Sequence, residues 1–245
     1  MKIPLAGCFN ARDLGGLPVR DGQLTRFRRL VRSDGVDHLE AADWRALVDH
    51  GIRTVIDLRN DDERTADRCP RPPELTTVHV PLDGPLFADI KRLGRDPAFW
   101  EGWGADRQLG TPLYYRAHLT RYGTSSAAVL RAIADAGPGG VLFHCVSGRD
   151  RTGQISMLCL ALAGASAETI AADYALSAVN LPALFQRRGI PYDGPKIDAL
   201  MAAEKTTIRE SIAATLAAFD LESHLAGCGL GASHVERLRE RLLGE

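Results

Sequence analysis

The sequence predicts an α/β fold in which a core of parallel β-strands is flanked by helices, with a further helical part at the C-terminus. Three short apolar runs, at residues 54–59, 77–81 and 141–145, have the continuous hydrophobicity of strands buried on both faces. Segments with helical periodicity separate them along the chain. Strands that alternate with helices indicate a parallel sheet.

The composition is that of an ordinary globular protein, with 45% hydrophobic and 25% charged residues. A chain of 245 residues can bury one sizeable core, and we predict a single domain over residues 1–245. The formal net charge of −1 gives no general attraction for nucleic acid, so no nucleic-acid partner is expected. A local basic group is interpreted as a solvated face; it comprises Arg26, Arg28, Arg29 and Arg32.

The N-terminal part contains a predicted turn, helix and strand in that order. Asp21-Gly22 is a hairpin-turn signal. A helix is expected next, ending near Gly51, a suitable C-cap, because helical spacing relates Leu39, Trp44, Leu47 and Val48. The strand at residues 54–59 then follows.

The segment at residues 86–122, between the second and third strands, is rich in aromatic residues and glycines. One interpretation is a lid, or one wall of a substrate pocket. The other is that its aromatic side chains fill a core, which is their more common role. The sequence leaves both interpretations open.

After the third strand the chain is predicted to be largely helical. Helical spacing covers residues 154–163, 167–179, 211–225 and 233–243. Three glycines, Gly227, Gly229 and Gly231, separate the last two of these helices. We expect these helices to pack as a bundle against the sheet.

Between the third strand and the helix at residues 154–163, the sequence predicts an anion-binding loop that starts at Cys145. Loop N–H groups and the positive end of a helix converge at such a junction. Their field stabilises a thiolate, so Cys145 is expected to be a nucleophile at neutral pH. The planar guanidinium of Arg151 can hold two oxygens of a phosphoryl group, which a lysine cannot do. The alternative is a structural cysteine after a buried strand.

Several motifs carry a resemblance to a known family. Residues 144–153 read His-Cys-Val-Ser-Gly-Arg-Asp-Arg-Thr-Gly, and this HCxxGxDRTG pattern resembles the loop of the tyrosine-phosphatase-like family of bacteria. Residues 10–16 resemble the family's NxRDLGG motif, and residues 173–177 resemble its DYxxS segment. The resemblance implies a cysteine-phosphatase-like fold. It also implies metal-independent hydrolysis of phosphate monoesters through a cysteinyl-phosphate, with no cofactor.

The resemblance implies roles for individual residues. The expected catalytic residues are Cys145, Arg151 and Asp150. The expected substrate-binding residues are Val146, Ser147, Gly148, Arg149, Thr152, Gly153 and Asp83. The hydroxyl of Thr152 is expected near the Cys145 sulfur.

The proton for the leaving group needs a donor, and the Trp-Pro-Asp loop that usually supplies it in tyrosine phosphatases is absent. Asp150 is the first candidate for this general acid, because a mycobacterial member of the family has an aspartate there. Asp83, after the strand ending at residue 81, is the second. Asp150 could instead order the loop through hydrogen bonds.

Other charged residues near the loop have two interpretations each. Arg149 replaces a lysine of the mycobacterial member, and either binds a second anionic group of the substrate or is solvated at the rim. His144 is expected to orient the loop. Ion pairs that brace the active-site face are expected for Arg12, Asp13, Asp57 and Arg59.

The expected partner is a phosphorylated substrate: a phosphotyrosine protein or other phosphoprotein, a phosphoinositide head group, or, as an alternative, a small phosphorylated metabolite. The loop does not separate these, because it binds the phosphate and not the group that carries it. Sulfur transfer of the rhodanese type and a phosphate-binding module without turnover are alternatives of other classes. The sequence leaves the oligomeric state open.

A cytoplasmic location without stable membrane insertion is expected. Residues 1–10 lack a basic and apolar export signal, and the longest apolar run, residues 155–165, is too short to span a bilayer. Members of the family can leave the cell without a signal peptide, and the sequence leaves that route open. The five cysteines have no paired spacing, so no disulfide framework and no metal site is expected.

Overall fold

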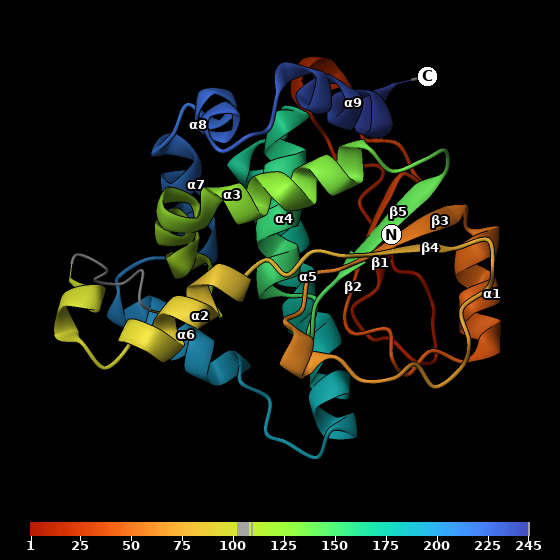
Figure 1. Ribbon diagram of the computed structural model, residues 1–245, viewed down its shortest axis with the longest axis horizontal. Coiled ribbons are helices and arrows are strands. Elements are labelled where there is room, and N and C mark those ends of the chain that lie inside the picture. Colours follow the sequence, from red (N-terminus) through yellow and green to blue (C-terminus); the bar gives the residue numbers. More distant parts are fainter. Residues whose placement is uncertain (102–107, 109, 245) are drawn as a thin grey trace.

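The computed structural model describes residues 1–101, 108 and 110–244, and its fold is α/β around a five-stranded sheet (Figure 1). The strand order is β1-β2-β5-β3-β4, and every neighbouring pair is parallel except β1 and β2. The predicted fold class is therefore confirmed. The strands are β1 (Arg12–Asp13), β2 (Leu30–Ser33), β3 (Ile52–Asp57), β4 (Thr76–His79) and β5 (Gly140–His144).

Two of these strands were not predicted as strands. β1 has only two residues, both charged, and β2 carries the charged Arg32 although all four of its positions are buried. A charged residue hides the apolar pattern that identified β3 and β5. Both strands matter for the site, because β2 lies directly beside β5.

The sheet separates two hydrophobic cores, and successive residues of each strand point to opposite cores. Val141 and Phe143 of β5 face one core, with α3 (Tyr115–Ala134), α4 (Asp150–Leu162) and α9 (Ala232–Leu243). Leu142 faces the other core, with Trp44 of α1 (Ala41–Asp49). Figure 1 shows α1 on the opposite side of the sheet from α3 and α4.

Most of the predicted helices are present with different boundaries, whereas α3 and two shorter helices, at residues 84–93 and 194–203, were not predicted. The helix after the loop begins at Asp150, and α5 (Ala167–Arg187) continues through Pro182 well beyond its predicted end. The predicted helix at residues 211–225 is wrong as one element: it is two helices, because the Asp220 side chain caps a new one by accepting from the Ser223 N–H (3.2 Å). The remaining helices are α2 (Gly84–Leu93), α6 (Gly194–Ala203), α7 (Ile208–Ala217) and α8 (Leu221–Gly227).

Short 3₁₀ turns complete the described chain: η1 (Arg20–Gly22), η2 (Asp61–Glu63), η3 (Pro97–Trp100) and η5 (Pro112–Tyr114). The predicted hairpin turn falls in η1, where Asp21 and Gly22 have φ angles of 59° and 72°. An antiparallel bridge joins Pro18 and Leu24 across it. Among the described residues, no helix combines the length and apolar character that a membrane span needs.

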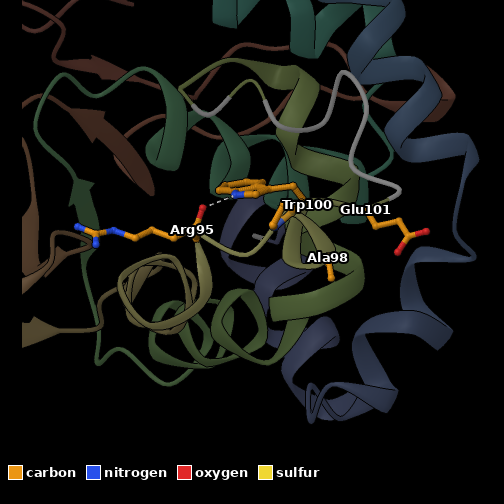
Figure 2. Close-up of a pocket in the computed structure, with 6 residues that line it drawn as sticks. Arg95, Ala98, Trp100 and Glu101 are labelled. Carbon is orange, nitrogen blue, oxygen red and sulfur yellow. Dashed lines mark hydrogen bonds between the residues drawn. The ribbon is translucent and has the colours of Figure 1, made fainter.

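Within the aromatic segment at residues 86–122, α2 and η5 pack against α3, which itself begins in this segment. Tyr114, Tyr115 and Tyr122 are buried, so for these three side chains the core-packing interpretation holds. A hollow of about 600 Å³ lies in this segment, and Figure 2 shows Trp100 among the residues that line it. Trp100 Nε1 donates to the Gly94 carbonyl (2.9 Å). The hollow's lining residues lie within residues 94–101, and none belongs to the loop at residues 144–153. Trp103 lies outside the described residues.

Candidate active site

The loop after β5 joins the central strand of the sheet to the first turn of α4. β5 ends at His144 and α4 begins at Asp150, so Cys145 stands at the carboxyl edge of the sheet and only 2% of it is exposed. In open α/β sheets this edge is where ligands bind. The residues predicted for catalysis in the loop are thus gathered at one junction.

The carbonyl groups of the loop are all directed toward donors of the surrounding protein. The carbonyls of three successive residues, Val146, Ser147 and Gly148, each accept a hydrogen bond. The donors are the Gly35 N–H and Arg188 for Val146 (3.2 and 3.1 Å), Asn10 Nδ2 for Ser147 (3.0 Å) and Arg32 Nη2 for Gly148 (2.7 Å). These bonds fix the orientation of each peptide group.

The N–H groups of the loop consequently face the other way. A trans peptide directs the N–H of the next residue opposite to its carbonyl, so the N–H groups of Ser147, Gly148 and Arg149 point away from the donors just named. None of these three N–H groups donates to an acceptor in the part of the chain that the structure describes. Together with the N-terminus of α4 they form a concave set of donors suited to an anion.

Gly148 is required by this geometry. Its φ angle is +66°, in the left-handed region that favours glycine. A β-carbon on this residue would also lie 2.4 Å from the Ser33 carbonyl oxygen of β2. The glycine therefore lets the loop turn while it packs against β2.

Arg32 holds the loop from beneath, and the interpretation of this arginine as part of a solvated face is wrong. The residue is 1% exposed, because β2 packs beside β5. Its guanidinium donates to the Gly148 carbonyl and forms an ion pair with Asp173 of α5. Arg12 pairs with the same carboxylate at 2.7 Å. Burial alone would raise the pKa of Asp173, but the two arginines lower it.

The bracing ion pairs predicted from the sequence are observed with partly different partners. Arg59 pairs with Asp57 (2.8 Å) and with Asp37, at the end of β3. Asp13 instead contacts His50 of the α1 C-cap (2.7 Å). The DYxxS segment supports the loop, since its Asp173 binds the two arginines beneath it.

Arg151 lies in the first turn of α4 and is held by a carboxylate that the sequence analysis missed. Its two terminal nitrogens bind both oxygens of Glu63, at 2.5 and 2.6 Å. Glu63 is fixed in turn, because its Oε2 accepts from the Asn60 N–H (2.9 Å) in a capping box. Burial would raise the pKa of Glu63, but Arg151 lowers it. The Asn60 to Glu63 spacing was the available sequence signal.

Asp83 immediately precedes α2 and lies beside Arg151. Its Oδ2 is 3.6 Å from Arg151 Nε, and its Oδ1 is 3.3 Å from Nε2 of His118. The residue is 6% exposed. Burial raises the pKa of Asp83 to about 7, with Arg151 opposing the shift and Glu63 and Asp150 adding to it. Asp83 thus joins the loop residues, although it is far from them in sequence.

The Asp150 carboxylate is engaged by fixed donors. The hydroxyl of Tyr174 donates to it at 3.0 Å, and Arg149 Nε contacts both of its oxygens at 3.2 Å. Burial raises the pKa of Asp150, while Arg149 and Tyr174 oppose the shift. Gly153 leaves room for the rings of Tyr115 and Tyr174 beside Asp150. A β-carbon at this position would lie 2.7 Å from the Tyr115 hydroxyl.

Arg149 is buried rather than solvated, with 7% of its surface exposed. Besides Asp150, its guanidinium binds both oxygens of Asp193 at 2.8 and 2.9 Å. Asp193 ends the loop between α5 and α6, at the N-cap position of α6, and was not predicted as a site residue. A second anionic group on a substrate would therefore compete with Asp193 for Arg149.

Two further residues of the motif are fully buried. His144 Nδ1 contacts the Cys145 carbonyl (3.3 Å), and burial lowers the pKa of this histidine to about 4. That geometry fits an orienting role. Thr152 Oγ1 has no hydrogen-bond partner among the described residues, and the proximity expected between its hydroxyl and the Cys145 sulfur stays a prediction.

Comparison with known proteins relates the whole chain to one family. The profile of the tyrosine phosphatase family matches residues 3–244. A protein of Cupriavidus necator, provisionally named a tyrosine-protein phosphatase, is 31% identical over 67% of this chain and 59% of its own length. A tyrosine-protein phosphatase of Nostoc commune is 32% identical over 60% of this chain and 48% of its own length.

The chain thus spans roughly half of the length of these two relatives. A third relative, the triple specificity protein phosphatase PtpB of Mycobacterium tuberculosis, is 29% identical over 98% of both chains. The predicted resemblance is confirmed by the match of the family profile along almost the entire sequence. This chain belongs to the tyrosine phosphatase family.

Proposed function

We propose that this protein hydrolyses phosphate monoesters through a cysteinyl-phosphate intermediate, with Cys145 as the nucleophile and Arg151 as the phosphoryl-binding cation. The observation that carries the proposal is the loop of Val146 to Arg149. Its carbonyls are held by the protein while its N–H groups face the concave side at the start of α4. A preorganised set of donors of this kind stabilises the charge that develops on a phosphoryl group.

The reaction proceeds in two displacements. In the first, the Cys145 thiolate attacks phosphorus, an S–P bond forms and the bond from phosphorus to the ester oxygen breaks. In the second, water attacks the cysteinyl-phosphate, the S–P bond breaks and inorganic phosphate is released. Arg151 and the loop N–H groups hold the equatorial oxygens throughout, and Glu63 keeps the Arg151 guanidinium oriented.

We assign the general acid to Asp83, ahead of Asp150. With a pKa of about 7, Asp83 carries a proton in a large share of molecules at neutral pH, as a proton donor must. Its Oδ2 is beside Arg151 Nε and therefore borders the phosphoryl position. The oxygens of Asp150 are already engaged by Tyr174 and Arg149, which supports a role in ordering the loop.

The substrates proposed are phosphotyrosine and other phosphoproteins, or phosphoinositides. The PtpB relative is named a triple specificity protein phosphatase, which supports a phosphoprotein as the substrate. A small phosphorylated metabolite remains the alternative, because the loop contacts only the phosphate. We further propose a cytoplasmic location and a single domain, as predicted from the sequence.

Sulfur transfer and phosphate binding without turnover are less well supported. Neither alternative function explains why Glu63 orients Arg151 or why Asp83 has a pKa near neutrality. Persulfide formation on Cys145 would favour the first, and tight phosphopeptide binding without turnover the second.

The test is release of inorganic phosphate in the presence of a chelator and a thiol reductant. Wild type and Cys145→Ser are compared on a phosphotyrosine peptide, phosphoinositides, and sugar and nucleoside monophosphates. We expect turnover by wild type and none by the variant. Equal turnover by both would contradict the cysteine mechanism, and the ranking of kcat/KM selects the substrate class.

A further inference from the structure

His118 is a buried histidine of α3 that the reaction described above does not use. None of its surface is exposed, and its ring lies between those of Tyr114 and Tyr122, with centroids 5.8 and 5.7 Å away. Its Nε2 faces Oδ1 of Asp83 at 3.3 Å. Asp83 is therefore bordered by Arg151 at one carboxyl oxygen and by His118 at the other.

The surroundings of His118 determine which nitrogen carries its proton. Gln154 Nε2 donates to His118 Nδ1 at 2.8 Å, and the same amide donates to Ser126 Oγ at 3.0 Å. A ring nitrogen that accepts a hydrogen bond carries no proton, so the proton of the neutral ring lies on Nε2. Burial lowers the pKa of His118 to about 4, and the ring is neutral at pH 7.

The two facing atoms, His118 Nε2 and Asp83 Oδ1, are both buried, and neither has a hydrogen bond of good geometry among the described residues. The Leu82 backbone nevertheless lies close enough to His118 to oppose the lowering of its pKa by burial. Buried polar atoms are normally paired. A small approach across the 3.3 Å separation would satisfy both atoms at once.

Resting on the proposed function, we propose that His118 is a positioning residue for the general acid. Its Nε2–H donates to Asp83 Oδ1, which directs the acid's own proton to Oδ2, the oxygen beside Arg151. Asp83 then gives that proton to the ester oxygen as the O–P bond breaks, and recovers one from the water that attacks the cysteinyl-phosphate. His118 keeps its proton throughout.

The proposal predicts a change in the pH dependence of turnover. The charged groups facing Asp83 are Arg151 from α4, Glu63 from η2 and Asp150 at the start of α4. Arg151 favours the ionised carboxylate and the two acids oppose it. The Nε2–H of His118 also favours the carboxylate, because it donates to it. Without this donor, the pH above which turnover falls should rise.

The variants compared are His118→Leu, which removes the donor, and His118→Gln, whose amide nitrogen can replace Nε2. For an alkyl phosphate, we expect His118→Leu to lower kcat about tenfold or more, as for a lost hydrogen bond to a charged group. The upper pH limit of turnover should move up by about one unit. An aryl phosphate with a good leaving group should be affected much less, and His118→Gln should restore part of the loss.

His224→Leu is the matched control, because His224 contacts the same helix α3 through the Leu119 carbonyl (3.0 Å), away from Asp83. It should leave the pH profile unchanged. An unshifted profile in His118→Leu would overturn the proposal, provided that Asp83→Asn loses alkyl phosphate turnover. If Asp83→Asn keeps that turnover while Cys145→Ser has none, the assignment of the acid itself fails.

A measurement on the unsubstituted protein remains informative even where His118→Leu does not fold. In ¹⁵N-histidine-labelled protein, the nitrogen shifts distinguish the two tautomers, and loss of a signal in His118→Gln assigns it. We expect His118 as the neutral Nε2–H tautomer. The Nδ1–H tautomer would overturn the proposal.

Discussion

The two sides of the active-site loop are built from different kinds of contact. Beneath the loop, Arg32 and Arg12 share the buried carboxylate of Asp173, and every loop carbonyl there has a donor. On the side of Asp83, one carboxyl oxygen and the facing His118 nitrogen lack hydrogen bonds. The lower side holds the shape of the loop, whereas the Asp83 side retains groups whose hydrogen bonding can change.

The charges on the two sides behave accordingly. Burial and Arg32 lower the pKa of Arg12 only to about 10, so this arginine stays charged at neutral pH. Burial raises the pKa of Asp83 to about 7, so this carboxyl can exchange its proton near neutrality. A group with a permanent charge suits a support, and one that titrates near the working pH suits a proton donor.

The largest effect expected on the Asp83 side is that of Asp83→Asn on alkyl phosphates. A general acid contributes about 10²–10⁴ in rate where the leaving group is poor, and kcat should fall by that order. In wild type, turnover should fall as pH rises through about 7, because the acid loses its proton. That decline should be absent from the residual activity of the variant, as a pH series of phosphate release would reveal.

Asp150→Asn is the control variant for Asp83→Asn. It removes a carboxylate of the same motif but, under our assignment, no proton donor. Its losses on alkyl and aryl phosphates should be similar. A loss confined to alkyl phosphates in Asp150→Asn, with none in Asp83→Asn, would exchange the two roles.

On the supporting side, Arg32→Ala should reduce the free energy of unfolding by about 3–5 kcal/mol, the usual result of removing one partner of a buried ion pair. Urea unfolding followed by circular dichroism measures it. Arg45→Ala is the control, because Arg45 pairs with Glu74 while 57% of the side chain is exposed. Such surface pairs contribute about 0–1 kcal/mol. An equal loss of unfolding free energy in both variants would contradict the prediction that the buried Arg32 stabilises the fold more than a surface arginine does.

Arg151→Lys tests the arginine that follows the loop and lies beside Asp83. The substitution keeps the charge but loses the planar guanidinium that binds both Glu63 oxygens and, under our proposal, two phosphoryl oxygens. We expect kcat to fall about 10²–10³-fold, as for the loss of one transition-state donor. Single-turnover phosphate release would separate this loss from product release. Near-normal turnover would contradict the bidentate role.

The sequence allowed prediction of the side of the site that is continuous in the chain. The loop at residues 144–153 follows a strand with a plain apolar pattern and precedes a helix, so its position at the sheet edge could be inferred. Glu63, His118 and Asp193 could not be inferred in this way. Each belongs to another element, and only the packing of η2, α3 and the α5–α6 loop brings it to Arg151, Asp83 or Arg149.

Arg32 shows a second limit of sequence reasoning. It stands in a cluster of arginines, and solvent exposure is the ordinary state of such a cluster. Burial followed from the pairing of β2 with β5 and from a carboxylate on α5, 141 positions away in the sequence. Long-range pairing of this kind leaves no local pattern.

The smallest effect we predict concerns Asp193, whose carboxylate would compete with an anionic group of a substrate for Arg149. Asp193→Asn should lower the KM for an aryl phosphate that bears a carboxylate by up to about fivefold, the range of a partly exposed ion pair. The same aryl phosphate without the carboxylate should show little change.

Asp198→Asn is the control, because Asp198 is an exposed acid of the same region and removes the same charge without the contact to Arg149. An equal fall in KM in both variants would show a general effect of charge. A fall confined to Asp193→Asn and to the doubly anionic substrate would assign to Arg149 the binding of a second anionic group. Arg149 would then contribute to substrate selection as well as to the ordering of Asp150, because a substrate anion can displace the Asp193 carboxylate from it.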